Sequence, residues 1–488
     1  MSLARNAVRG VIWTITTSVG GRAIGLLGTL ALTHFLVPEQ YGEFHIALLV
    51  VALTGALMSF GFGQYLVANP RAGRDVAFHA TVFHCTLGFV ALGLMVVFRD
   101  HFGAFFKGEP NLGPYLPLLA VASALERLAY IPSRILARDM RFNVLAIRSL
   151  ASELVYTAVT LYLAWRGWGA RSLLWGVVAR AAVSSAILIV SVDRRDWLDP
   201  SPLRRDTARQ LMTFFPLGIA NLVHWLNHKG DNLVIGALYG KAAVGGYNLA
   251  YNLADVPASH IGEHIGDVLL PSFAKLENDE ARRRALVRAT GLLALAVFPL
   301  AVGLGAVAHT LIRAAFDESW SFVAPMLVAL STLSVLRPVG WLIRSYLEAK
   351  LQSSLLLKLE VFRALALYGM IVAAAPFGVV GSCVGVGLAF GLHVLASAHV
   401  VKRNDGILVR DLLVPTLPPL MACVPMAIAV LGVRYLLAPS LGPWPLLGVE
   451  IVAGAVTFVA SAFAFAGPQA RDFVQLVRNA LSRRRAEA

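Results

Sequence analysis

Long apolar segments recur along almost the whole chain and are separated by short polar connections. Because a helix needs about 20 apolar residues to cross the hydrocarbon core of a bilayer, each segment is a candidate membrane span. About fourteen segments have this length: 10–36, 43–68, 76–98, 114–137, 144–165, 171–192, 211–239, 245–271, 286–307, 321–348, 355–376, 378–401, 412–436 and 444–467. A spanning strand would instead show about ten residues of strict alternation. The pattern therefore predicts an all-α polytopic membrane protein.

One connection is more polar than the others and divides six predicted spans from six. Residues 193–210 are charged and contain two prolines, which is typical of a linker. This boundary predicts the following organisation: an N-terminal lobe at 1–192, a cytoplasmic linker at 193–210, a C-terminal lobe at 211–401, an extra helix pair at 402–467, and a basic tail at 468–488.

The two predicted lobes share a short sequence repeat. Residues 32–47 align without gaps on residues 235–250, so that Gly42 meets Gly245 at an offset of 245 − 42 = 203 residues. Six spans separate the copies, and both copies therefore cross the membrane in the same direction. Parallel repeats of this kind build transporters from two pseudo-symmetric lobes, with the substrate site between them.

Composition and charge placement support the membrane assignment. Only 14% of the residues are charged, whereas a soluble domain carries about 25%. The net charge of +14 comes from Lys and Arg clusters on alternate connections: Arg71/Arg74, Arg134/Arg138/Arg141, Arg194/Arg195/Arg204/Arg205/Arg209, Arg282/Arg283/Arg284/Arg288, Lys402/Arg403/Arg410 and Arg483/Arg484/Arg485. This bias predicts that both termini are cytoplasmic. It also accounts for the positive charge without a nucleic-acid partner.

Several chemistries have no support in the sequence. The three cysteines lie in apolar spans and form neither a disulfide framework nor a CxxC metal pair. The first apolar run is interrupted by Arg22 and indicates a retained helix rather than a signal peptide. Nucleotide-binding and nucleophile motifs are absent. We therefore expect no enzyme activity and no cofactor, and transport driven by H+, Na+, the membrane potential or the substrate's own gradient.

Polar residues follow one face of each of two neighbouring predicted helices. The faces carry Asn221, His224, His228 and Asp231 on the first helix and Asn248, Asn252, Asp255 and Ser259 on the second. Such groups are costly in hydrocarbon unless they face protein or water. The stripes therefore predict either a hydrated cavity or a structural polar seam between helices.

Cations inside the predicted spans are candidates for binding an anionic head group. Arg22 and Lys229 lie on the first helix of each lobe and could both face a diphosphate. The alternatives are a snorkelling Arg22 and a Lys229–Asp231 ion pair. Arg337 precedes Pro338, which predicts a kink, and Arg337 and Arg363 are further candidate cavity residues.

Histidines and carboxylates are candidates for ion coupling. His224/His228 and His260/His264 are each spaced i, i+4, with Glu263 and Asp267 near the second pair. This spacing suits a metal site, proton coupling or structural hydrogen bonding. No HExxH sequence is present, so we expect no metal. The ion-coupling candidates are Asp231, Asp255, His260, Glu263, His264 and Asp267.

Aromatic rings and amides on the same two helices are candidates for contacting sugars. They are Trp225, Tyr247, Tyr251, Asn227, Asn248 and Asn252; the same residue types also serve as packing and interface anchors. At the predicted inner ends of spans four and five, Arg127 and Arg148 are expected to lie near headgroups, with Glu126 or Glu153 as ion-pair partners.

Several stretches resemble a known family. They read LTHFLVPEQYGEF at 32–44, RDMRF at 138–142, DNLVIGALYG at 231–240, GGYNLAYNLADVP at 245–257 and LPSF at 270–273. Together they are similar to the polysaccharide transporter (oligosaccharide flippase) family of the multidrug/oligosaccharidyl-lipid/polysaccharide exporter superfamily. The resemblance covers nearly the whole chain in order, although His224, His228 and Lys229 are not part of the family pattern.

The resemblance implies a fold and an activity. The fold would be a V-shaped, MATE-like arrangement of two six-helix lobes plus an extra C-terminal helix pair. The activity would be alternating-access translocation of undecaprenyl-diphosphate-linked oligosaccharide across the bacterial inner membrane, with the polysaccharide polymerase and export machinery as possible partners. Two alternatives stay open: an ion-coupled drug or metabolite efflux pump, and a membrane glycan polymerase or ligase. The chain lacks the large external loop that the enzyme alternative requires.

Overall fold

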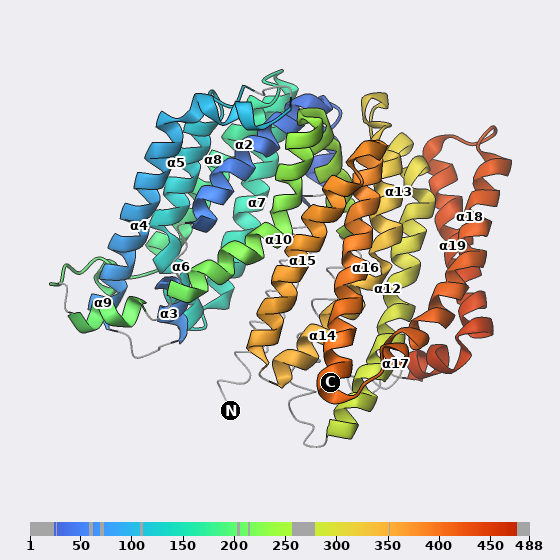
Figure 1. Cartoon of the computed structure of the whole chain (residues 1–488). Coiled ribbons are helices and arrows are strands. Elements are labelled where there is room, and N and C mark those ends of the chain that lie inside the picture. The colour runs from blue at the N-terminus through green and yellow to red at the C-terminus, as the bar shows by residue number, and fades with distance from the viewer. Residues whose placement is uncertain are drawn as a thin grey trace, which may run out of the picture. The chain divides into compact units, whose positions relative to one another are not determined.

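The computed structural model describes residues 24–25, 27–57, 62–68, 73–107, 111–202, 205–212, 215–255, 279–350 and 352–475. Within these ranges the regular structure is entirely helical, as Figure 1 shows, and no strand occurs. The predicted all-α class is therefore confirmed. By packing, the chain forms two compact units, Met1–Gly245 and Gly246–Ala488. The lobe boundaries expected from the 193–210 linker rest on a different criterion and stay a prediction.

The N-terminal unit is a bundle of helices around α2 and α4. Its helices are α2 (Pro38–Leu57), α3 (Phe62–Ala68), α4 (Arg74–Val97), α5 (Leu116–Leu128), α6 (Tyr130–Arg138), α7 (Phe142–Trp165), α8 (Arg171–Val190), α9 (Arg205–Met212) and α10 (Phe215–Tyr239). Helix α7 packs along α8, α5 packs against α4 and α8, and α10 packs against α2. The chain continues from α10 into a helix at 241–255.

The C-terminal unit is built on the long helix α12 (Asp279–Ala315). It also contains α13 (Val323–Leu333), α14 (Arg337–Ala349), α15 (Ser353–Ala373), α16 (Gly378–Asp405), α17 (Val409–Leu413), α18 (Leu417–Leu437) and α19 (Pro443–Phe465). Helices α18 and α19 pair with each other and both pack on α12. The core of this unit joins Leu286 and Leu293 of α12 to Ile343 of α14 and Val394 of α16.

Several helices have the length and composition of membrane spans. In the described part of the chain, seven helices qualify singly and an eighth qualifies if the bent pair Val323–Leu333 and Arg337–Glu348 is counted as one span. Their outer surfaces are apolar: Leu436, Val452 and Val456 are 70%, 62% and 65% exposed. Such surfaces suit lipid rather than water. The protein is therefore a multi-pass membrane protein, and the total of fourteen spans stays a prediction.

The fourth predicted span of each half is broken. In the N-terminal unit α5 ends at Leu128 and α6 begins at Tyr130; Pro132 cannot donate to the carbonyl of Leu128 and its ring crowds that group. In the C-terminal unit a single 3-10 turn, Ser334–Leu336, separates α13 from α14, and the two helices bend by 42°. Pro338 has the same relation to Ser334. The kink predicted at Pro338 is confirmed.

The repeated glycines lie in direct backbone contact within the N-terminal unit. A Cβ on Gly42 would lie 1.8 Å from the carbonyl oxygen of Lys241, and a Cβ on Gly245 would lie 2.5 Å from that of Pro38. Only glycine allows this approach between α2 and residues 241–245. Beside the crossing, Lys241 Nζ donates to Glu43 Oε1 at 2.7 Å.

Candidate functional site

The break in the C-terminal unit gathers several of the predicted site residues. Arg337 begins α14 and forms an ion pair with Asp255. Three rings surround the guanidinium carbon, at 5.7 Å (Tyr251), 5.5 Å (Trp341) and 5.0 Å (Phe390) from their centroids. These distances are typical of cation–π contacts. Among the described residues, Arg337 is therefore held in an aromatic cage with the Asp255 carboxylate beside it.

A second set of ion pairs follows on α14 and α15. Glu360 accepts from Arg344 at 3.0 Å and lies 3.6 Å from Arg363. Arg344 also pairs with Glu348 at 2.8 Å. With Arg337 and Asp255, this arrangement, which we call the C-terminal cluster, contains three arginines and three carboxylates. Its charge is balanced, so each cation can remain ionised inside the bundle.

The break in the N-terminal unit contains a buried arginine of a different kind. Arg127 lies in the last turn of α5 and is 5% exposed. Its Nε and Nη2 atoms have no hydrogen-bond partner in the described part of the chain. Glycines make room for the side chain, because a Cβ on Gly88 would lie 2.4 Å from Nη1 and a Cβ on Gly55 would lie 3.7 Å from Nη2.

A histidine and a second arginine surround Tyr130, just beyond this break. The ring of His84 stacks on Tyr130 with centroids 4.2 Å apart, and the guanidinium of Arg134 lies 4.9 Å from the Tyr130 centroid. Gly63 of α3 leaves the space for Tyr130, because a Cβ there would lie 2.6 Å from the ring. We call Arg127, Arg134, His84 and Tyr130 the N-terminal cluster.

The ion pairs expected for Arg127 do not form. Glu126 is exposed, and the carboxylate of Glu153 lies beside Gly25, where a Cβ would be 2.9 Å from Oε1. Neither Arg127 nor Arg134 pairs with a carboxylate among the residues the structure describes. The expectation that Arg127 lies near headgroups is wrong, because the side chain points into the bundle. The sequence offered one signal for this, an arginine five residues before Pro132.

The predicted residues on α10 lie in the N-terminal unit. Asn227, Asp231 and Asn232 are each 2% exposed, and Asp231 accepts hydrogen bonds from the backbone and side-chain nitrogens of Asn232 at 2.8 and 2.9 Å. This part of the stripe is packed against protein. Trp225 and His228 are half-buried. Lys229 is exposed.

The predicted aromatic and amide residues of 247–252 lie on one helix. Tyr247 is fully buried, and its ring centroid is 5.8 Å from that of Tyr251. Asn252 Nδ2 donates to Asn248 Oδ1 at 2.8 Å. The Asn252 side chain is exposed, so one amide of this pair is accessible.

Other predictions lie outside the described residues: those for Arg22, His260, Glu263, His264 and Asp267, and those for the side chains of Asn221 and His224. In the part of the chain that is described, no three His, Cys, Asp or Glu side chains are placed to hold a metal ion.

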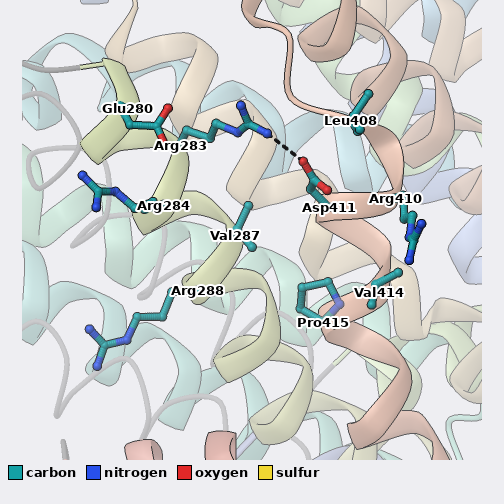
Figure 2. Close-up of a pocket in the computed structure, with 10 residues that line it drawn as sticks. All are labelled: Glu280, Arg283, Arg284, Val287, Arg288, Leu408, Arg410, Asp411, Val414 and Pro415. Atoms are coloured by element: carbon teal, nitrogen blue, oxygen red, sulfur yellow. Dashed lines mark hydrogen bonds and ion pairs between the residues drawn. The ribbon is translucent and has the colours of Figure 1, made fainter.

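A basic cavity lies at the start of α12, between this helix and α17. It has a volume of about 730 Å³ and is lined by Glu280, Arg283, Arg284, Val287, Arg288, Leu408, Arg410, Asp411, Val414 and Pro415. Figure 2 shows Arg283 reaching across to Asp411, with which it pairs at 2.8 Å, whereas Arg284 and Arg288 point away from α17. The guanidinium groups therefore do not converge on one ligand. The cavity instead belongs to the two basic clusters that the sequence places at the start of α12 and around residue 410.

One buried ion pair was missed by the sequence reasoning. Glu450 of α19 is fully buried and accepts from Arg434 Nε of α18 at 2.9 Å and from Thr310 of α12 at 2.8 Å. These bonds fix the helix pair to α12. Glu450 also lines an apolar groove of about 440 Å³ between α12 and the pair. A lone carboxylate in the last span was the available signal, but its partner lies on another helix.

The comparisons with known proteins agree with this architecture. The sequence profile of the family described as "Polysaccharide biosynthesis protein" matches residues 31–325, which is more than half of the chain. The succinoglycan biosynthesis transport protein ExoT of Rhizobium meliloti (strain 1021) is 24% identical over 460 residues, which cover 92% of this chain and 90% of ExoT.

Two solved structures share the fold. The lipid II flippase MurJ in an inward closed conformation has a TM-score of 0.74 at 15% identity and covers 95% of this chain and 100% of its own. An inward-facing MATE family transporter of the MOP superfamily has a TM-score of 0.62 at 17% identity, over 78% and 96% of the two chains. The MATE-like fold is thereby confirmed, and the chain belongs to the polysaccharide biosynthesis protein family.

Proposed function

We propose that this protein is a flippase that moves undecaprenyl-diphosphate-linked oligosaccharide from the cytoplasmic to the periplasmic leaflet of the bacterial inner membrane. The observation that carries the proposal is the family match over residues 31–325. The name of ExoT describes a polysaccharide transport protein, and MurJ, whose fold this chain shares, is named a lipid II flippase. A transporter of this kind needs no catalytic residues, and we propose none.

The broken spans support the proposal on physical grounds. Discontinuous helices at matching positions of two repeats are typical of transporter substrate sites. Ionisable groups inside spans are costly unless they face protein or water, and they mark the paths of polar substrates. Arginines suit a diphosphate, and aromatic rings with accessible amides suit sugars. The C-terminal cluster, with Tyr251, Trp341 and nearby Asn252, offers the aromatic and amide groups that suit sugars.

The remaining features complete the proposed mechanism. Both termini face the cytoplasm, as the basic connections indicate, and the lobes alternate access by rocking. Arg22 and Lys229 contact the diphosphate, while Asp231 and Asp255 couple transport to H+ or Na+. The polysaccharide polymerase and export machinery receive the product.

An efflux pump for cationic compounds is the second candidate, and the charges disfavour it. A site for cations would be acidic, whereas the C-terminal cluster is balanced and the N-terminal cluster contains only basic and aromatic groups. The N-terminal cluster would repel cationic compounds, and the C-terminal cluster would not attract them.

Reconstitution tests the proposal. Purified protein is placed in vesicles that contain a fluorescent polyprenyl-diphosphate oligosaccharide, and an external glycosidase reports how much substrate reaches the outer leaflet. We expect the accessible fraction to rise well above that of protein-free vesicles. Arg288→Gln, at the edge of the basic cavity, is the matched control and should behave as the wild type. Accessibility equal to that of protein-free vesicles, with a monodisperse protein, would overturn the proposal.

A further inference from the structure

The two helix breaks differ in how their charges are balanced. At the C-terminal break, Arg337, Arg344 and Arg363 each lie beside a carboxylate. At the N-terminal break, Arg127 and Arg134 have no carboxylate partner among the described residues, and the buried Nε atom of each has no hydrogen-bond acceptor there. Among the described residues, each arginine at the C-terminal break therefore has a carboxylate beside it, and the two arginines at the N-terminal break do not.

An ionised guanidinium is not stable in a dry bundle without acceptors. Desolvation of an unpaired charge costs several kcal/mol, and an arginine side chain stays protonated in proteins. Arg127 is 5% exposed, so bulk water cannot supply the missing acceptors. A ligand that brings anionic oxygen atoms would satisfy them, and a guanidinium binds such oxygens through two parallel hydrogen bonds.

The surroundings of Arg127 are built to keep the side chain inside. Gly55, Gly63 and Gly88, from three different helices, leave the volume that Arg127 and Tyr130 occupy. The Tyr130 ring is held by stacking on the His84 ring and by a cation–π contact with the Arg134 guanidinium. A Cβ at Gly63 would collide with Tyr130 and one at Gly88 with Arg127, whereas one at Gly55 would make ordinary contact with Arg127. The position therefore pre-organises a cation rather than tolerating one.

We propose that the N-terminal cluster, in addition to Arg22 and Lys229, binds the diphosphate of the lipid-linked substrate and that the C-terminal cluster does not. The inference rests on the proposed flippase function and divides its substrate between two sites. Arg127 supplies the buried donors, and Arg134, 4.9 Å from the Tyr130 ring centroid, adds a second positive charge. The balanced, aromatic C-terminal cluster is left to contact the uncharged glycan.

Binding measurements on the full-length protein in detergent separate the two clusters. The probes are a polyprenyl diphosphate and the corresponding polyprenol, which differ only in the anionic group, with inorganic diphosphate as a third ligand. We expect the wild type to bind the diphosphate lipid at least tenfold more tightly than the alcohol. Arg127→Gln should lose this preference, Arg127→Lys should keep part of it, and Arg337→Gln should change it less than threefold.

A second variant distinguishes ligand binding from a purely structural role. Cys85 lies on α4 next to Arg127, with its Sγ 3.8 Å from the Arg127 carbonyl oxygen. Cys85→Asp supplies an internal carboxylate, and Cys85→Asn is its uncharged control. If Arg127 binds the diphosphate, Cys85→Asp should be at least as stable as Cys85→Asn yet lose the diphosphate preference.

The outcomes separate the inference from the proposed function. A wild type without preference for the diphosphate lipid overturns both. A wild-type preference that persists in Arg127→Gln or in Cys85→Asp overturns the inference and leaves the flippase proposal standing, as does a preference lost in Arg337→Gln alone. If Arg127→Gln is not monodisperse, Arg127→Lys and Cys85→Asp decide. Tight binding of inorganic diphosphate would show that the site recognises the anion independently of the lipid.

Discussion

Arg127 and Arg337 both stand at the break of a fourth span, but their surroundings have little in common. Arg337 has the Asp255 carboxylate and three aromatic rings around its guanidinium. Arg127 has glycines, a stacked histidine–tyrosine pair beyond it, and unused donors. In both units a proline three or four residues after the break interrupts the helix. The arginine at one break is paired with a carboxylate, and the arginine at the other is not paired with one among the described residues.

The difference shows what a helix break can be used for. A break frees backbone groups and lets a side chain turn inward. Where a carboxylate from another helix forms an ion pair with that side chain, the pair holds the two helices together at the break. Where no carboxylate does, the charge stays available to a ligand. The backbone of a repeat can be similar in both halves while the side chains divide the work.

The largest expected effect comes from making the C-terminal break resemble the N-terminal one. Asp255→Asn removes the partner of Arg337, which is 13% exposed in its side chain, and should lower the free energy of unfolding by about 3 kcal/mol. Unfolding in mixed micelles measures this. In the double variant Asp255→Asn/Arg337→Met most of the loss should be recovered, because no unpaired charge remains. Additive losses would contradict the pairing.

Filling the space around Arg127 should have the next largest effect. Gly88→Ala places a methyl group 2.4 Å from Nη1 of a buried arginine, and overpacking of this kind costs about 2 kcal/mol. The matched change is Gly340→Ala beside the other break, where the nearest atom is Val394 Cγ2 at 3.5 Å. There we expect a change within about 0.5 kcal/mol. Equal thermal shifts for the two variants would refute the packing difference.

A smaller effect should follow from opening the bridge between two arginines. Glu360 joins Arg344 and Arg363, and its side chain is 20% exposed. Glu360→Gln should cost about 1.5 kcal/mol, because charge-assisted hydrogen bonds are lost. Glu348→Gln is the control: it pairs with Arg344 alone and is 33% exposed, so its loss should stay near 0.5 kcal/mol. Reversal of this order would argue against a bridging carboxylate.

The smallest effect is expected at an exposed pair far from both breaks. Hydrogen bonds from Arg288 hold the pKa of the Asp472 carboxyl below its usual value. The stabilisation that this pair gives the folded state is therefore complete above the unfolded-state pKa of an aspartate carboxyl, about 3.9. It disappears as the pH falls through the lower folded-state pKa of Asp472. Asp472→Asn should lower the melting temperature slightly at pH 7 and leave it unchanged at acid pH. At 1 M salt the decrease at pH 7 should be smaller. A shift that grows on acidification would be inconsistent with this sign.

Much of the architecture could be predicted because it depends on patterns local in sequence. Apolar length gave the helices, and Pro338 gave the kink, since a missing N–H breaks a helix wherever it falls. The repeat of Gly42 in Gly245 identified two residues that touch. Arg337 and Asp255 were both candidates, and the structure pairs them.

The charge balance at the breaks could not be predicted in the same way. Whether Arg127 meets Glu126 depends on which way each side chain turns at the end of α5, and adjacent residues on a helix point in different directions. The partner of Glu450 lies sixteen residues earlier on another helix, at Arg434. Such pairings arise from tertiary packing, which no local spacing encodes.

The contact between Gly42 and Gly245 also carries a consequence for ancestry. If the two segments descend from one duplicated gene, a single glycine once met its own copy in a pair of identical chains, as residues near a two-fold axis do. After fusion of the duplicated gene, the two glycines in this contact are encoded by separate codons. Because a methyl group on either glycine would strike a backbone carbonyl oxygen rather than a movable side chain, neither codon could drift to compensate for the other. Glycine is therefore required on both sides of this crossing.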